Sequence, residues 1–79
     1  MKEREIQKRL IRNLEREGWV VIKIILANKR GVPDIIAFRN GEIKFIEVKT
    51  GNNKLTPLQE IWCELIIKNG FRYEIVREI

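Results

Sequence analysis

The fold is decided by residues 31–49, which read GVPDIIAFRNGEIKFIEVK. Asn40-Gly41 is a strong signal for a type I′ β-turn, because both residues tolerate the positive φ angles that this turn requires. Alternating apolar residues flank the turn, so we predict a β-hairpin with strands at 34–38 and 42–49. With a two-residue turn, Arg39 pairs with Glu42, and each further pair moves one residue outward on both strands.

This register places Asp34 directly opposite Glu47. Directly opposed residues have Cβ atoms roughly 4.5–5.5 Å apart on one face of the sheet, where two carboxylates repel each other. The same face carries Ile36 and Phe45, so the pair is costly unless something compensates for its charge. Mg²⁺ or Mn²⁺ would do so, because hard cations prefer carboxylate oxygens. Asp34 is also the only Asp in a chain that contains ten Glu.

Lys49 follows Glu47 by two residues, so its side chain should project from the same face of the strand. There it could orient a metal-bound water or stabilise a developing negative charge. An ordinary, weak Glu47–Lys49 pair at a solvated strand end is the alternative, and the opposed Asp34 argues against it.

Before the hairpin, apolar residues at helical spacing predict a helix over about 2–17, which Gly18 ends. The nearly continuous apolar run at 19–26 predicts a buried strand. A loop over 27–33 follows, in which Lys29 and Arg30 precede Gly31. A basic, glycine-containing loop beside a metal site could hold a phosphate backbone, although a solvated turn is the alternative.

Successive side chains of the first helix are about 100° apart around its axis. Glu3 and Gln7 fall inside the apolar arc and therefore point toward the sheet, whereas Glu5 falls on the far side. The alternative for Glu3 is a frayed first turn in which the carboxylate favours the helix dipole. The outer face carries four cations, as is usual for a solvated surface: Lys8, Arg9, Arg12 and Arg16.

After the hairpin, we predict a polar loop at 50–55, a helix from Thr56 to about residue 69 and a last strand at 71–76. Thr56 and Pro57 are a typical N-cap and first-turn pair. Gln59 completes a capping box with Thr56, and the alternative is that Gln59 projects toward the carboxylates.

A helical stripe of the second helix is expected to join the core, and it consists of Leu58, Ile61, Trp62 and Leu65. Cys63 and Ile67 lie outside this stripe. Cys63 is expected to be a small buried or interface hydrophobe without a redox role. Ile67 and the apolar strand at 19–26 suggest a dimer surface.

Composition limits the chemistry further. The chain has 79 residues, enough for one domain, with 44% hydrophobic and 34% charged residues and a net charge of +5, which favours a polyanionic partner. It contains neither His nor Ser, which excludes Ser-His triads and imidazole ligands. The single Cys63 cannot form an internal disulfide, and no apolar run could span a membrane, so a reducing cytoplasm is expected.

Together, these residues resemble a known enzyme family. Gly31-Val32-Pro33-Asp34, Glu47-Val48-Lys49 and then Gln59 are similar to the motifs of the PD-(D/E)xK nuclease superfamily, and within it to the VRR-NUC (virus-type replication-repair nuclease) family. The predicted α-β-β-β-α-β order matches the superfamily core, a mixed four-stranded sheet flanked by helices. The family's opening helix carries a Glu four residues before a Gln, which selects Glu3 and Gln7, and Asn28 lies where the family tends to have an Asn.

The resemblance covers nearly the whole chain, 1–79, and implies a phosphodiesterase that depends on Mg²⁺ or Mn²⁺. It implies that Asp34, Glu47 and the carbonyl of Val48 bind the metal. Glu3 would complete the site directly, through water or at a second metal, and Lys49 would position the attacking water. Gln59 would contact the site, and the DNA contacts would come from the remaining family positions and the basic loop: Gln7, Asn28, Lys29 and Arg30.

Stand-alone members of this size resemble phage nucleases that act as homodimers on branched DNA such as four-way (Holliday) junctions. A phage-encoded member would work in the host cytoplasm, with DNA as partner and no small-molecule cofactor. Two alternatives remain open. One is a restriction-type endonuclease, although no added segment is present to read bases. The other is a non-catalytic, basic nucleic-acid-binding module, which would gain nothing from acids that face a phosphate.

Overall fold

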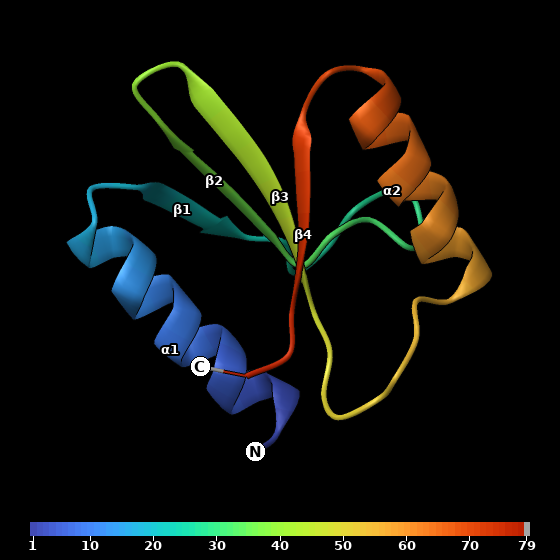
Figure 1. Ribbon diagram of the computed structural model, residues 1–79, viewed down its shortest axis with the longest axis horizontal. Coiled ribbons are helices and arrows are strands. Elements are labelled where there is room, and N and C mark those ends of the chain that lie inside the picture. Colours follow the sequence, from blue (N-terminus) through green and yellow to red (C-terminus); the bar gives the residue numbers. More distant parts are fainter. Residues whose placement is uncertain (79) are drawn as a thin grey trace.

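The computed structural model describes residues 1–78, which form an α/β domain with a four-stranded sheet between two helices (Figure 1). The order is α-β-β-β-α-β, as predicted. The elements are α1 (Glu3–Arg16), β1 (Val20–Lys23), β2 (Ile35–Arg39), β3 (Glu42–Val48), α2 (Pro57–Lys68) and β4 (Arg72–Val76). Within residues 1–78, no helix is long and apolar enough to cross a membrane.

The β2–β3 hairpin forms in the predicted register. Arg39 pairs with Glu42, and Ile36 pairs with Phe45. Asn40 and Gly41 have φ angles of 47° and 80°, so both turn residues adopt the positive φ of a type I′ turn. β1 pairs with β2 in antiparallel orientation and β4 pairs with β3 in parallel orientation, which makes the sheet mixed and places β1 and β4 at its edges.

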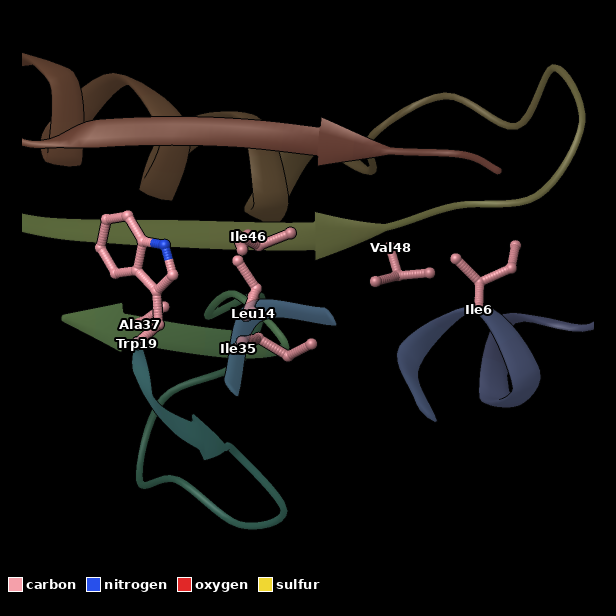
Figure 2. Packing of buried hydrophobic residues seen from close by; sticks show 7 residues of the cluster. All are labelled: Ile6, Leu14, Trp19, Ile35, Ala37, Ile46 and Val48. Atoms are coloured by element: carbon pink, nitrogen blue, oxygen red, sulfur yellow. The ribbon is translucent and has the colours of Figure 1, made fainter. Parts of the chain in front are cut away.

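The core lies between α1 and one face of the sheet (Figure 2). Its buried residues are Ile6, Leu14, Trp19, Ile35, Ala37, Ile46 and Val48. The strand members alternate with residues of the opposite face, as the two-residue period of a strand requires. Because burial of one large aliphatic side chain contributes roughly 1.5–3 kcal/mol, this layer is the main source of stability.

The first strand differs from the prediction. The apolar run at 19–26 forms only a short strand, Val20–Lys23, and that strand is not buried. Val20 and Ile22 are about half exposed, while Ile25 and Leu26 are 86% and 92% exposed. The reason is that β1 lies at the sheet edge and neither helix covers its outer face, so a run of apolar residues need not mean burial.

The core-facing stripe of α2 was also predicted wrongly. Ile66 is buried, and Gln59, Trp62 and Cys63 are partly buried, which is the i, i+3, i+4, i+7 spacing of one helix face. The predicted members Leu58, Ile61 and Leu65 are 42–51% exposed. The helix is turned so that Gln59 faces the end of β3, and this rotation brings Cys63 and Ile66 inward.

α2 covers its side of the sheet incompletely and leaves an open cavity of about 390 Å³. Apolar residues from the sheet, from α2 and from the loop before β2 line it, among them Ile36, Phe45 and Trp62. The loop is fastened to α2, because the indole Nε1 of Trp62 donates a 2.8 Å hydrogen bond to the carbonyl of Arg30. This contact fixes the segment that leads into Asp34.

Candidate active site

The candidate site lies where β2 begins and β3 ends, at one end of the two central strands and near the beginnings of both helices (Figure 1). Asp34 immediately precedes β2, and Glu47 is the penultimate residue of β3. Lys49 follows β3, Glu3 opens α1, and Gln59 lies in the first turn of α2. Five side chains from distant parts of the sequence therefore reach one end of the sheet.

Asp34 and Glu47 lie together, as the hairpin register predicts. Glu47 is only 3% exposed, although it is a carboxylic acid. The Oδ2 atom of Asp34 accepts a 2.9 Å hydrogen bond from the backbone N–H of Val48, which holds the Asp34 side chain across the end of β3. The backbone thus orients one carboxylate of the pair, and strand alternation orients the other.

The environment raises the pKa of Glu47 to about 8. Burial is the largest cause, followed by hydrogen bonding and charge from Asp34, while the ammonium of Lys49 acts in the opposite direction. The Oε1 atom of Glu47 is buried and has no hydrogen-bond partner within residues 1–78. A buried acceptor without a partner is costly, so this atom is ready to bind a cation.

Gln59 serves the helix cap and the site at once. Its Oε1 accepts a 2.9 Å hydrogen bond from the backbone N–H of Thr56, which completes the predicted capping box. Its Nε2 donates a 3.3 Å hydrogen bond to Oε2 of Glu47. The two interpretations of Gln59 are therefore compatible, since opposite ends of one amide carry the two contacts.

Lys49 and Glu3 complete the surroundings of Glu47. Lys49 is 9% exposed and its charge acts on Glu47, although it forms no ion pair with a carboxylate within residues 1–78. Glu3 is exposed, yet its charge contributes to the raised pKa of Glu47, and Glu5 makes no such contribution. Of the two first-turn acids of α1, only Glu3 therefore acts electrostatically on Glu47, as its helical angle leads us to expect, and its place in the site stays a prediction.

The predicted DNA-contacting residues lie at the surface. Asn28, Lys29 and Arg30 are exposed in the loop before β2, and Gln7 is half-buried on α1. Neither Gln7 nor the side chains of the loop residues make a hydrogen bond to the carboxylates within the described chain. Their role as DNA contacts stays a prediction.

The site suits a Mg²⁺-type ion with few protein ligands. No three side chains of His, Cys, Asp or Glu within residues 1–78 gather as a metal-binding cluster. Two carboxylates do lie together, with an unpartnered oxygen on Glu47 and the main chain of Val48 beside Asp34. Mg²⁺ commonly binds through one or two carboxylates and takes its remaining ligands from water and substrate phosphate, so the donor set fits.

One residue of the site was missed by sequence reasoning. Tyr73 on β4 pairs with Phe45, which places it on the Glu47 face of the sheet. Its hydroxyl is buried without a partner within the described residues, and burial together with the charges of Glu47 and Asp34 raises the pKa of Tyr73. Nothing in the local sequence marks Tyr73, because its role depends on the parallel pairing of β4 with β3.

Comparisons with known proteins agree with this arrangement. The sequence profile of the family described as "VRR-NUC domain" matches residues 2–78. A solved structure titled "VRR_NUC domain" superposes with a TM-score of 0.88 at 31% identity and covers 96% of this chain and 84% of that one.

Three curated relatives are similar over most of the chain. They are "Putative nuclease p44" of Acyrthosiphon pisum secondary endosymbiont phage 1 (37% identical over 60 residues), a "Fanconi-associated nuclease 1 homolog" of Arabidopsis thaliana (34% over 53 residues) and a "UPF0102 protein" of Thermotoga maritima (33% over 58 residues). The matched segments cover 75%, 60% and 73% of this chain, but 64%, 6% and 54% of those proteins. The chain thus spans less than two thirds of each curated relative.

Proposed function

The chain belongs to the VRR-NUC domain family, and from this premise we propose that it is a metal-dependent DNA endonuclease that hydrolyses phosphodiester bonds. The observation that carries the proposal is the pairing of the buried Glu47 with the half-buried Asp34. Oε1 of Glu47 is buried without a hydrogen-bond partner among residues 1–78, and the raised pKa shows that the surroundings of Glu47 disfavour its negative charge, which a bound cation would compensate. Two of the relatives carry the word nuclease in their names, which supports the same reaction class.

Each site residue has a defined task in this proposal. Asp34, Glu47 and the carbonyl of Val48 would hold Mg²⁺ or Mn²⁺, and Glu3 would complete the set through a water molecule or at a second ion. When bound, the metal would acidify a water molecule and neutralise charge that develops on the phosphate. The metal is thus the reason for the pairing of the acids.

The remaining residues position the reactants. Lys49 would hold the attacking water or the phosphate oxygen that becomes more negative during the reaction. Gln59 would fix the orientation of the Glu47 carboxylate, as partners of metal ligands commonly do. On the substrate side, Lys29 and Arg30 would bind backbone phosphates, and Asn28 and Gln7 would supply further polar contacts.

For the substrate, we propose branched DNA such as a four-way junction, cut by a homodimer that holds two sites at one branch point. The support for a second copy is apolar exposure in the strand and loop around Ile25 and Leu26 and on the outer side of α2. Surfaces of this kind mark protein–protein contacts. The proposed compartment is the cytoplasm, where a lone Cys63 stays reduced.

The decisive experiment is cleavage of labelled four-way-junction, flap, single-stranded and linear duplex DNA in Mg²⁺, Mn²⁺ and EDTA. The wild type is compared with two variants, Lys49→Ala and Asp34→Asn. We expect cutting in either metal, none in EDTA, and loss of cutting in both variants while their circular dichroism spectra remain native. Tight binding without cutting in any metal would instead identify a binding module. Wild-type rates in Asp34→Asn would refute the site assignment.

Sedimentation at micromolar concentration tests the dimer. Wild type should sediment at twice the monomer mass, and Leu58→Glu/Ile61→Glu should test whether the outer side of α2 is the contact. A monomer that still resolves junctions would refute the homodimer.

A further inference from the structure

The exposed face of α1 is strongly cationic. With Ile6 at 0° and about 100° per residue, four cations fall within an arc roughly 100° wide, opposite the apolar arc that contacts the core. They are Lys8, Arg9, Arg12 and Arg16, and all are exposed. We call these four residues the α1 stripe. Glu5 is the only acid within the same arc.

The stripe is not neutralised by neighbouring acids. None of its four cations takes part in an ion pair within residues 1–78, although Glu5 and Glu15 are at helical spacing from some of them. A shallow cavity of about 220 Å³ lies between Glu5 and three members of the stripe, Lys8, Arg9 and Arg12. Several unpaired cations around an open cavity suit an anion supplied from outside.

The two helices differ in the charge of their side chains. α1 contains five cationic and three acidic side chains, whereas α2 contains Lys68 against Glu60 and Glu64. The outer side of α2 is also apolar, with Leu58 and Ile61 about half exposed. The two helices therefore differ in charge, with a surplus of two cations on α1 and of one acid on α2, and polyanion binding follows such an asymmetry.

α1, the helix that carries the stripe, begins at the end of the sheet where the candidate site lies. Glu3, at the start of α1, is close enough to influence Glu47, and α1 runs from there along the sheet to the start of β1 (Figure 1). At 1.5 Å per residue, Arg16 lies about 20 Å along the helix from Glu3. Since base pairs of duplex DNA are about 3.4 Å apart, this length corresponds to about six base pairs.

We propose that the α1 stripe binds the phosphate backbone of one duplex arm, which extends from the cut site for about six base pairs. This inference rests on the proposed nuclease function, because it takes the position of the substrate from the Asp34–Glu47 site. The contacts go to phosphates and set the direction of the arm without reading its sequence. A single rigid helix suits this task, because its cations keep a fixed spacing along the duplex.

The test compares two double variants of equal charge. Arg12→Gln/Arg16→Gln removes the distal half of the stripe, and Lys23→Gln/Lys68→Gln removes two exposed cations outside it. Binding to a labelled 20-base-pair duplex is measured by fluorescence anisotropy in EDTA, over roughly 50–200 mM salt. Each lost phosphate contact should reduce the slope of log K against log salt by about 0.9, so the stripe variant should lose about 1.8 and the control nothing.

Arm length provides a second measurement. For the wild type, affinity should rise as the arm grows to about six base pairs and then level off. The affinity of Arg12→Gln/Arg16→Gln should depend little on arm length. In Arg12→Lys/Arg16→Lys the positive charges are kept, so the dependence of affinity on arm length should return. Equal slopes for the two double variants, with intact wild-type binding, would overturn the stripe and leave the nuclease proposal standing. Absence of wild-type DNA binding would overturn both.

Discussion

Gln59 joins the beginning of α2 to the end of β3, because its Nε2 lies 3.3 Å from Oε2 of Glu47 while its Oε1 caps the helix through Thr56. The orientation of the Glu47 carboxylate is thereby coupled to a helix cap. Rotation of the amide would break both hydrogen bonds, so the cap keeps the donor directed at Glu47. Separate changes can distinguish the two roles.

The cap and the site contact of Gln59 should separate in two variants. Thr56→Ala removes the hydroxyl cap, and we expect it to lower the free energy of unfolding by about 1 kcal/mol with little effect on cleavage well below the melting temperature. Gln59→Glu keeps an oxygen for the N–H of Thr56 but loses the donor to Glu47. Its cleavage rate should fall roughly 10–100-fold. Thermal melts and single-turnover cleavage measure the two effects, and equal rate losses would contradict the separation.

Metal affinity should depend steeply on pH. Because the pKa of Glu47 is about 8, the carboxyl is mostly protonated at pH 6 and must release its proton when a cation binds. Between pH 6 and 7.5, the apparent affinity for Mn²⁺ should therefore rise about tenfold per pH unit. Calorimetric titration in buffers of different ionisation enthalpy would show release of one proton. A flat affinity profile would contradict the raised pKa.

Stability without metal should change with pH in the opposite sense. The folded chain binds the Glu47 proton more tightly than the unfolded chain, in which the pKa of this carboxyl has its ordinary value of 4.5. The bound proton therefore stabilises the folded state. This contribution is complete below about pH 4.5 and is lost as the pH rises through about 8. Glu47→Gln should thus be more stable than wild type at pH 8.5 in EDTA, with a smaller difference at pH 5. Urea unfolding at both pH values tests this, and a pH-independent difference would contradict it.

The two first-turn acids of α1 should differ in function. Glu3 influences Glu47, whereas Glu5 lies by the cavity of the α1 stripe. Glu3→Gln should reduce the cleavage rate by roughly 10–100-fold, as loss of an outer carboxylate of a metal site does. Glu5→Gln should leave the rate within about twofold and strengthen DNA binding slightly, because it removes a negative charge beside phosphates. Equal losses in the two variants would defeat the helical-angle argument.

Gly31 should be the glycine least tolerant of substitution. It has a φ of +81°, and an added Cβ would lie 2.8 Å from Cβ and C of Leu58 on α2. Gly18 also has a positive φ, of +89°, but an added Cβ there meets nothing within 4 Å. Gly18→Ala should therefore cost about 1–2 kcal/mol for strain alone. Gly31→Ala should cost about 1–3 kcal/mol more for the overlap, measured by urea unfolding.

The hairpin was predictable because its determinants are local. Asn40-Gly41 sets the turn, the turn sets the register, and the register brings Asp34 to Glu47 without any knowledge of the rest of the fold. Helical periodicity likewise indicated which first-turn acid of α1 acts electrostatically on Glu47. Both inferences depend on backbone geometry over a few residues, which the sequence specifies directly.

Burial of β1 and of α2 was not predictable in the same way. Ile22 and Ile61 look like core residues in the sequence, yet about half of each side chain is exposed. Whether an apolar residue is buried depends on which surfaces other elements cover, and only the sheet order and the helix rotation decide that. Tyr73 illustrates the same limit, since it reaches the Glu47 face through the parallel pairing of β4.

The order of the elements, the hairpin register and the pairing of two carboxylates follow from short-range turn and strand geometry, so they could be inferred from local sequence. The environment of that pair depends on how distant segments pack together. Burial raises the pKa of Glu47, Gln59 contacts it from α2, and Glu3 approaches it from α1. These properties arise because segments distant in the sequence pack together and exclude water from the site. The resulting low local dielectric exists only in the assembled fold.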